Sequence, residues 1–103
     1  MKKVFFHPAA EEEMDVSADY YESKAKGLGI KFVDEIEKSL KQVSLSPNRW
    51  PIISGQTRRY LLRRFHYCLL YQIYGDDIYV LAVMHFHRKP DYWKKRNRQQ
   101  WRK

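Results

Sequence analysis

Residues 58–93 carry the pattern that decides the fold: RRYLLRRFHYCLLYQIYGDDIYVLAVMHFHRKPDYW. The stretch predicts two or three successive β-strands, with turn residues at positions 64–66 and 75–77. Over residues 67–74 an apolar face alternates with a mixed one, which is typical of a strand buried on at least one side. Residues 78–85 are nearly all apolar, aromatic or β-branched, as in a central strand covered on both faces. Because the glycine and two aspartates at 75–77 favour a tight turn, we expect an antiparallel pair.

The chain ahead of this stretch predicts a short strand and two helices. Residues 2–7 are β-prone, and Pro8 suits the first turn of a helix, with acidic residues following it near the helix N-terminus. Apolar side chains then recur at helical spacing, first to about Lys26 and again over about 28–45. Since only Gly27-Leu28-Gly29 separates the two helices, we expect them to pack antiparallel.

These elements predict a single α+β domain over residues 1–93. It has an N-terminal strand, an antiparallel helical hairpin and a twisted antiparallel sheet of three further strands. A chain of 103 residues is long enough for one hydrophobic core. Residues 94–103 form a basic tail, either a short helix docked by Trp93 and Trp101 or a mobile arm.

Charge is distributed unevenly along the chain. Residues 1–55 hold 8 basic and 9 acidic residues, whereas residues 56–103 hold 12 basic and 3 acidic residues. A net charge of +9 in the second half favours an anionic partner, either nucleic acid or an acidic protein segment; a merely solubilising surface is the alternative. No run approaches the roughly 18 apolar residues of a membrane span, so we expect a cytoplasmic protein with no membrane partner.

Four pieces of sequence, taken in their order, resemble the RelE/ParE family of bacterial type II toxins. They are Tyr20-Tyr21-Glu22, Gly27-Leu28-Gly29 followed by Phe32, residues 59–67 with Tyr71 beyond them, and residues 85–90 with Trp93. The resemblance covers about residues 2–93 and is closer to the ParE-like, plasmid-stabilisation branch than to RelE. It implies a RelE/ParE-like fold and a growth-inhibiting toxin.

The resemblance also implies partners. A cognate antitoxin would neutralise the toxin by wrapping an acidic, partly disordered segment around its basic surface, which agrees with the charge asymmetry. The ParE branch poisons DNA gyrase and has no established catalytic centre, and this is the function we expect. The RelE branch, which cleaves messenger RNA in the ribosome, and a non-toxic nucleic-acid-binding relative are the alternatives. No cofactor is implied.

The RelE alternative assigns candidate catalytic residues by position. Cleavage through 2′-OH attack needs a base, a cation for the phosphate charge and an acid for the leaving oxygen. Arg63 falls on the arginine ahead of the central strand, and Tyr92 on the tyrosine near the C-terminus. Phe86 occupies the position of the other catalytic arginine, with Arg88 two residues later. Gln, Thr, Arg and Arg at residues 56–59 replace the expected lysines.

His85 and His87 lie two residues apart on a predicted strand, which places both imidazoles on one face. Either is a candidate general acid or base near pH 7, and His85 joins the catalytic candidates. A metal site would need a third ligand that the sequence does not offer, so we expect none. Hydrogen bonding at the strand end is the simpler interpretation. The lone cysteine, Cys68, lies in mid-strand and is expected to be a buried hydrophobic residue.

A cluster of arginines flanks the first predicted turn. Arg58, Arg59 and Arg63 precede it, and Arg64 is its first residue, so the cluster could hold phosphates or carboxylates. We expect Arg63 and Arg88 to converge at the sheet edge; salt bridges to the acidic first helix are the structural alternative. The residues expected to contact the antitoxin or the target are Arg58, Arg59, Arg64, His87, Lys89 and Trp93.

Overall fold

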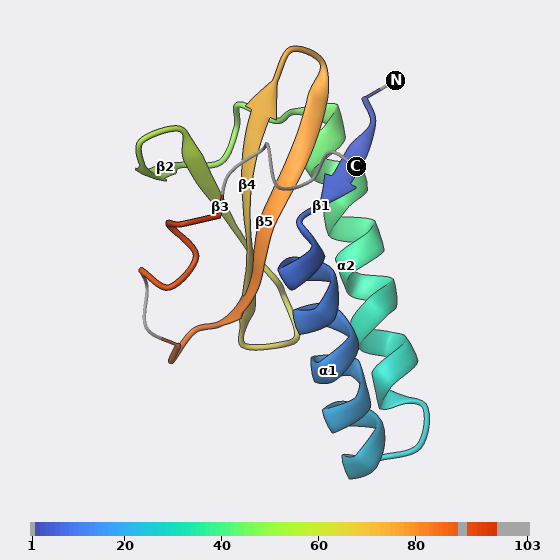
Figure 1. Ribbon diagram of the computed structural model, residues 1–103. Coiled ribbons are helices and arrows are strands. Elements are labelled where there is room, and N and C mark those ends of the chain that lie inside the picture. The colour runs from blue at the N-terminus through green and yellow to red at the C-terminus, as the bar shows by residue number, and fades with distance from the viewer. Residues whose placement is uncertain (1, 89–90, 97–103) are drawn as a thin grey trace.

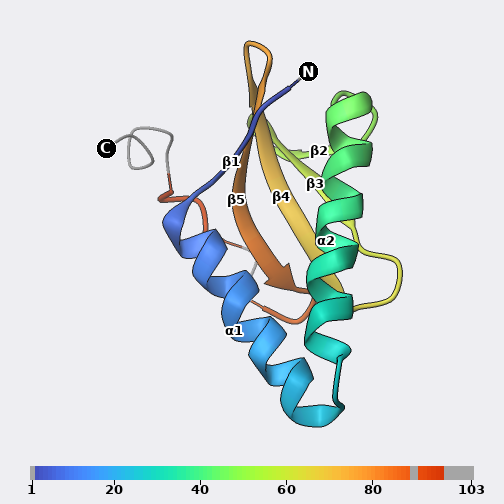
Figure 2. The ribbon, with the colours of Figure 1, turned by 90° about the vertical axis from the view of Figure 1, so that its right-hand side faces the viewer.

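The structure is a computed structural model that describes residues 2–88 and 91–96. Its elements, in chain order, are β1 (Val4–Phe6), α1 (Pro8–Lys24), α2 (Leu28–Leu45), β2 (Ile52–Ser54), β3 (Thr57–Leu61), β4 (Tyr67–Tyr74) and β5 (Asp77–His85). The strands form one sheet in the order β1-β5-β4-β3-β2. The two helices run side by side along one face of it (Figure 1; Figure 2). The expected α+β class is confirmed.

The sheet is mixed only at its first edge. β1 pairs in parallel with β5, and every other neighbouring pair of strands is antiparallel. The predicted hairpin is present, because Tyr74 pairs with Asp77 around a turn in which Gly75 has a φ of +56°. The sheet has one strand more than expected, since the three residues of β2 also pair with β3. A run this short shows no alternation that could identify it in the sequence.

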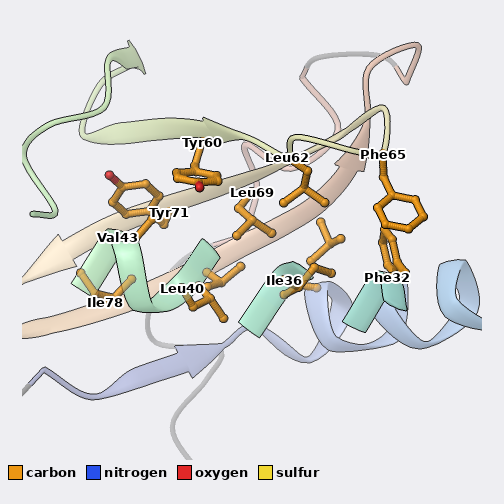
Figure 3. Close-up of a cluster of buried hydrophobic side chains, with 13 residues drawn as sticks. Phe32, Ile36, Leu40, Val43, Tyr60, Leu62, Phe65, Leu69, Tyr71 and Ile78 are labelled. Atoms are coloured by element: carbon orange, nitrogen blue, oxygen red, sulfur yellow. The ribbon is translucent and has the colours of Figure 1, made fainter. Parts of the chain in front are cut away.

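Both faces of the sheet are buried, as the composition of β5 predicts. All seven residues from 78 to 84 are buried. On one face, Leu69, Tyr71 and Ile78 pack against α2 residues such as Phe32 and Ile36 (Figure 3). The opposite face carries a second apolar cluster, which consists of Cys68, Leu70, Leu81, Ala82, Met84 and Trp93. Trp93, which follows β5 in the chain, therefore covers part of the face that the helices leave open.

The junction between the helices depends on Glu22 and Gly29. The Glu22 carboxylate accepts hydrogen bonds from the backbone N–H groups of Gly27 (2.9 Å) and Gly29 (3.0 Å), which satisfies free donors at the start of α2. A Cβ on Gly29 would lie 2.5 Å from the carbonyl oxygen of Ala18. Only glycine permits this close approach. α1 ends at Lys24, two residues earlier than expected, because Ala25 is extended.

Cys68 is buried, as its position in mid-strand predicts. Burial raises the pKa of its thiol to about 11, so the group stays protonated near neutral pH. In the part of the chain that the structure describes, no helix is long and apolar enough to cross a membrane.

Candidate functional site

On the side away from β4, the last part of β5 lacks a neighbouring strand, and side chains complete this edge. β1 pairs with β5 only as far as Val80. Beyond that point, the Arg96 guanidinium donates a hydrogen bond to the Leu81 carbonyl oxygen (2.7 Å). The backbone N–H of Val83 donates to Oε1 of Glu13 (3.1 Å). A residue of α1 and a residue near the C-terminus thus satisfy backbone groups that an edge strand would otherwise expose.

Glu13 and Arg96 also form a bidentate ion pair. Nη1 and Nη2 of Arg96 donate to Oε1 and Oε2 of Glu13 at 3.0 and 2.8 Å. The side chains are only 14% and 16% exposed, so water screens the pair weakly. The pair joins α1 to the C-terminal segment, residues 91–96, and fixes that segment against the sheet.

Tyr92 lies close to two guanidinium groups. The Arg88 and Arg96 Cζ atoms lie 4.2 and 4.9 Å from the centre of its ring, within the range of cation–π attraction. The Tyr92 hydroxyl is buried near the Glu13 carboxylate, and within the described residues it makes no hydrogen bond of good geometry. Burial, followed by the nearby Glu13 carboxylate, raises the pKa of this phenol. Tyr92 therefore orders the arginines around it and is poorly suited to exchanging protons near neutral pH.

A groove of about 390 Å³ lies between α1 and the end of β5; we call it the α1–β5 groove. Its charged and polar lining includes Glu12, Glu13, Tyr67, His85, Arg88 and Arg96. The Tyr67 hydroxyl is fixed in place by a hydrogen bond from Oγ of Ser17 (3.0 Å). The groove thus brings His85 and Arg88, two of the predicted catalytic residues, to one surface.

His85 is held in one orientation at the end of β5. Its Nδ1 accepts a hydrogen bond from the backbone N–H of His87 (3.1 Å), and its ring meets that of Tyr67 edge-on at 5.1 Å. Burial, followed by the charges of His87 and His66, lowers the pKa of His85. The imidazole is therefore neutral near pH 7, with its proton on Nε2. Among the described residues, no three His, Cys, Asp or Glu side chains are placed to hold a metal ion.

Arg63 and Arg64 lie elsewhere, in the loop of residues 62–66 between β3 and β4. Both of their backbone N–H groups donate to the Glu35 carboxylate, and their side chains line a hollow beside α2. Arg63 and Arg88 thus line different hollows, so the expected convergence of these arginines in one site is not observed. Within residues 2–88 and 91–96, none of the clustered arginines forms an ion pair with α1.

The other predicted contact residues differ in how accessible they are. Arg59 and His87 are exposed. Arg58 instead holds the chain before β2, donating to the carbonyl oxygens of Trp50 (2.7 Å) and Asn48 (3.1 Å). Trp93 is only 4% exposed and packs in the second apolar cluster. Lys89, like Trp101, lies outside the described residues.

Glu13, Arg96 and Glu35 were not among the residues predicted from the sequence. Glu13 and Arg96 are 83 residues apart, and Glu35 is 28 residues from Arg63. In the sequence, Glu13 belongs to an acidic run at a helix start and Arg96 to a basic tail, which are both features of a solvated surface. No local pattern marks these residues as partners.

Comparisons with known proteins support one family. A family model described as ParE toxin of type II toxin-antitoxin system, parDE, matches residues 4–90. The fold resembles a chain of the chromosomal ParDE TA system from P. aeruginosa, with a TM-score of 0.70 and 20% identity over 82% of this chain and 96% of that one. It also resembles a chain of the intact E. coli RelBE toxin-antitoxin complex, with a TM-score of 0.66 and 20% identity over 85% and 100% of the two chains. No curated protein matches the sequence significantly.

Proposed function

This chain belongs to the ParE toxin family of type II toxin–antitoxin systems, and we propose that it acts as a ParE-like inhibitor of DNA gyrase. The observation that carries the proposal is the placement of Tyr92. An RNase mechanism on the RelE pattern would use this tyrosine for proton transfer. Its hydroxyl is buried, its pKa is raised, and its ring packs against two arginines.

The separation of the arginines supports the same conclusion. Cleavage of a phosphodiester needs a cation and proton-transfer groups around one phosphate. Arg63 lines the hollow beside α2, whereas Arg88 lines the α1–β5 groove. A toxin that acts by binding a protein target has no such requirement, because exposed cations spread over a surface suffice for docking.

The antitoxin is expected to be acidic where it contacts this chain. Residues 8–45, which comprise the two helices, hold five basic and nine acidic residues, a net charge of −4, so the remainder of the chain carries +12. An acidic segment that folds onto the sheet side would be steered by this field and would neutralise it. Arg59, Arg64 and His87 are exposed and remain our candidates for contacts with the antitoxin or the target.

A supercoiling assay tests the gyrase proposal directly. Purified gyrase and relaxed plasmid are incubated with ATP and increasing amounts of the chain, and supercoiled and linear DNA are separated on a gel. We expect supercoiling to fall and linear, cleaved plasmid to accumulate. A cell-free translation reaction receives the same amounts in parallel. Inhibition of translation without any effect on gyrase would contradict the proposal.

One observation favours RNA cleavage as a second candidate function. The α1–β5 groove holds an accessible arginine, Arg88, beside the neutral imidazole of His85, a combination that could bind a phosphate and transfer a proton. If this candidate is correct, Arg88→Ala and His85→Gln should each abolish cleavage of ribosome-bound messenger RNA. Cleavage that survives both substitutions would remove these residues from any catalytic role.

A further inference from the structure

A polar hollow of about 770 Å³ separates α2 from the loop of residues 62–66, and we call it the α2-loop hollow. Its five cationic lining residues are Lys31, Lys38, Lys41, Arg63 and Arg64. Only two acidic residues, Asp34 and Glu35, line it as well. In the described part of the chain, none of the five cations forms an ion pair. The hollow therefore has an excess of positive charge that no side chain of the fold neutralises.

Glu35 shows how this hollow binds an anion. The consecutive backbone N–H groups of Arg63 and Arg64 both donate to one oxygen of its carboxylate, the second at 2.9 Å. Two successive N–H groups that converge on one oxygen form a concave anion-binding site. The loop keeps this shape because the Leu62 N–H donates to the Tyr67 carbonyl oxygen (3.0 Å). The fold thus builds an anion site and fills it with its own carboxylate.

We propose that the α2-loop hollow binds phosphate groups of a nucleic-acid backbone, which take the place of the Glu35 carboxylate. An incoming carboxylate would only repeat the contacts that Glu35 already makes. A phosphate offers more acceptor oxygens, so it can bind the paired N–H groups and an arginine side chain together.

The length of the hollow favours a polymer over a small anion. Lys31 and Lys41 are ten residues apart on α2, which corresponds to about 15 Å along the helix axis. A phosphodiester chain presents negative charges repeatedly over such a distance. Tyr60 is the only aromatic residue of the lining, and it is only 9% exposed, so it gives bases no surface for stacking. The contact is therefore with the backbone and tolerates any base sequence.

The first test uses inorganic phosphate as the probe. In the full chain labelled with ¹⁵N, phosphate should shift the amide signals of Arg63 and Arg64. Glu35→Gln keeps an acceptor oxygen for the loop but removes the competing charge, so the affinity for phosphate should rise about fivefold. Glu37→Gln is the matched control, because it makes the same change in net charge on the same helix outside this hollow. An equal rise in both variants would overturn the proposal.

The second test distinguishes nucleic acid from an acidic protein segment. A short oligonucleotide and a polyglutamate peptide of equal charge are titrated separately into the chain. The oligonucleotide should shift the amide signals of Arg63 and Arg64. In Lys38→Ala, the slope of the logarithm of its affinity against the logarithm of the salt concentration should be smaller by about one. Equal binding of polyglutamate, or oligonucleotide shifts confined to residues outside the hollow, would contradict the assignment. The outcome is independent of the gyrase assay, since neither titration depends on gyrase or on RNA cleavage.

Discussion

Tyr92, a residue at a family-typical position, is packed against two arginines in this chain. Its ring packs against the guanidinium groups of Arg88 and Arg96, and its hydroxyl is buried near Glu13 without a well-formed hydrogen bond. A buried hydroxyl without a hydrogen bond destabilises a fold, while the ring that carries it contributes packing. The two parts of this side chain should therefore respond oppositely to substitution.

Tyr92→Phe is expected to leave the free energy of unfolding unchanged or to raise it by about 1 kcal/mol, because it removes only the unpaired hydroxyl. Tyr92→Ala is the paired comparison and should lower that free energy by about 3 kcal/mol, because it also removes the ring. Urea denaturation followed by circular dichroism measures both. A loss of more than about 1 kcal/mol in Tyr92→Phe would mean that the hydroxyl makes a stabilising hydrogen bond.

Glu13→Gln is expected to lower the free energy of unfolding by about 2 to 3 kcal/mol, because it leaves Arg96 charged and poorly exposed without its partner. Glu12→Gln changes the same charge on an exposed neighbour and should stay within about 0.5 kcal/mol of the unmodified chain. A double-mutant cycle that combines Glu13→Gln with Arg96→Met isolates the coupling energy between the two side chains. A coupling energy near zero would show that the pair does not hold the C-terminal segment.

The His85 side chain gives stability a defined dependence on pH. Because folding lowers the pKa of His85, the unfolded chain binds more protons near pH 6. The contribution of His85 to the free energy of unfolding is therefore fully present above the pKa that His85 has in the unfolded chain. It is lost as the pH falls from about 7 to about 5. Urea midpoints measured across this range should fall less in His85→Gln than in the unmodified chain. Parallel pH profiles would show that His85 does not titrate differently on folding.

At the scale of elements, the helical hairpin depends on the close approach of α1 and α2 at Gly29. In an ordinary helix, alanine is more favourable than glycine by about 1 kcal/mol. Here the added Cβ would lie 2.5 Å from a backbone oxygen of α1, which cannot move without shifting the helix. Steric repulsion should outweigh helix propensity at this position.

Gly29→Ala is thus expected to lower the free energy of unfolding by about 1 to 3 kcal/mol. Ile30→Ala, at an adjacent residue that is 68% exposed, is the control and should change it by no more than about 0.5 kcal/mol. Thermal and urea unfolding both report the difference. A stabilised Gly29→Ala variant would mean that the helices separate easily at this crossing.

At the scale of the whole molecule, the elements were predictable and most of the site was not. Helical spacing, the glycine between the helices and the composition of residues 67–85 are local signals, and they predicted both helices and the central hairpin. β2 was not predicted, because its three residues show no periodicity. The Glu13–Arg96 pair and the Glu35 site join residues that are far apart in the sequence. Such contacts arise only from tertiary packing.

Charge is also distributed unevenly along the sequence, with a net charge of −4 in residues 8–45 and +12 elsewhere. This asymmetry accounts for both kinds of partner in our proposals. The basic part suits an acidic antitoxin segment, and the α2-loop hollow extends positive charge onto an otherwise acidic helical hairpin. Neither contact requires the chain to catalyse a reaction, which agrees with the proposed inhibition of gyrase.

The most direct test of this function follows DNA and protein synthesis in bacterial cells immediately after the chain is expressed alone. Parallel cultures receive short pulses of labelled thymidine and labelled methionine within minutes of induction. Gyrase inhibition predicts that thymidine incorporation falls first and that double-strand breaks appear. An earlier fall in methionine incorporation, with intact chromosomal DNA, would contradict the account and would favour cleavage of messenger RNA.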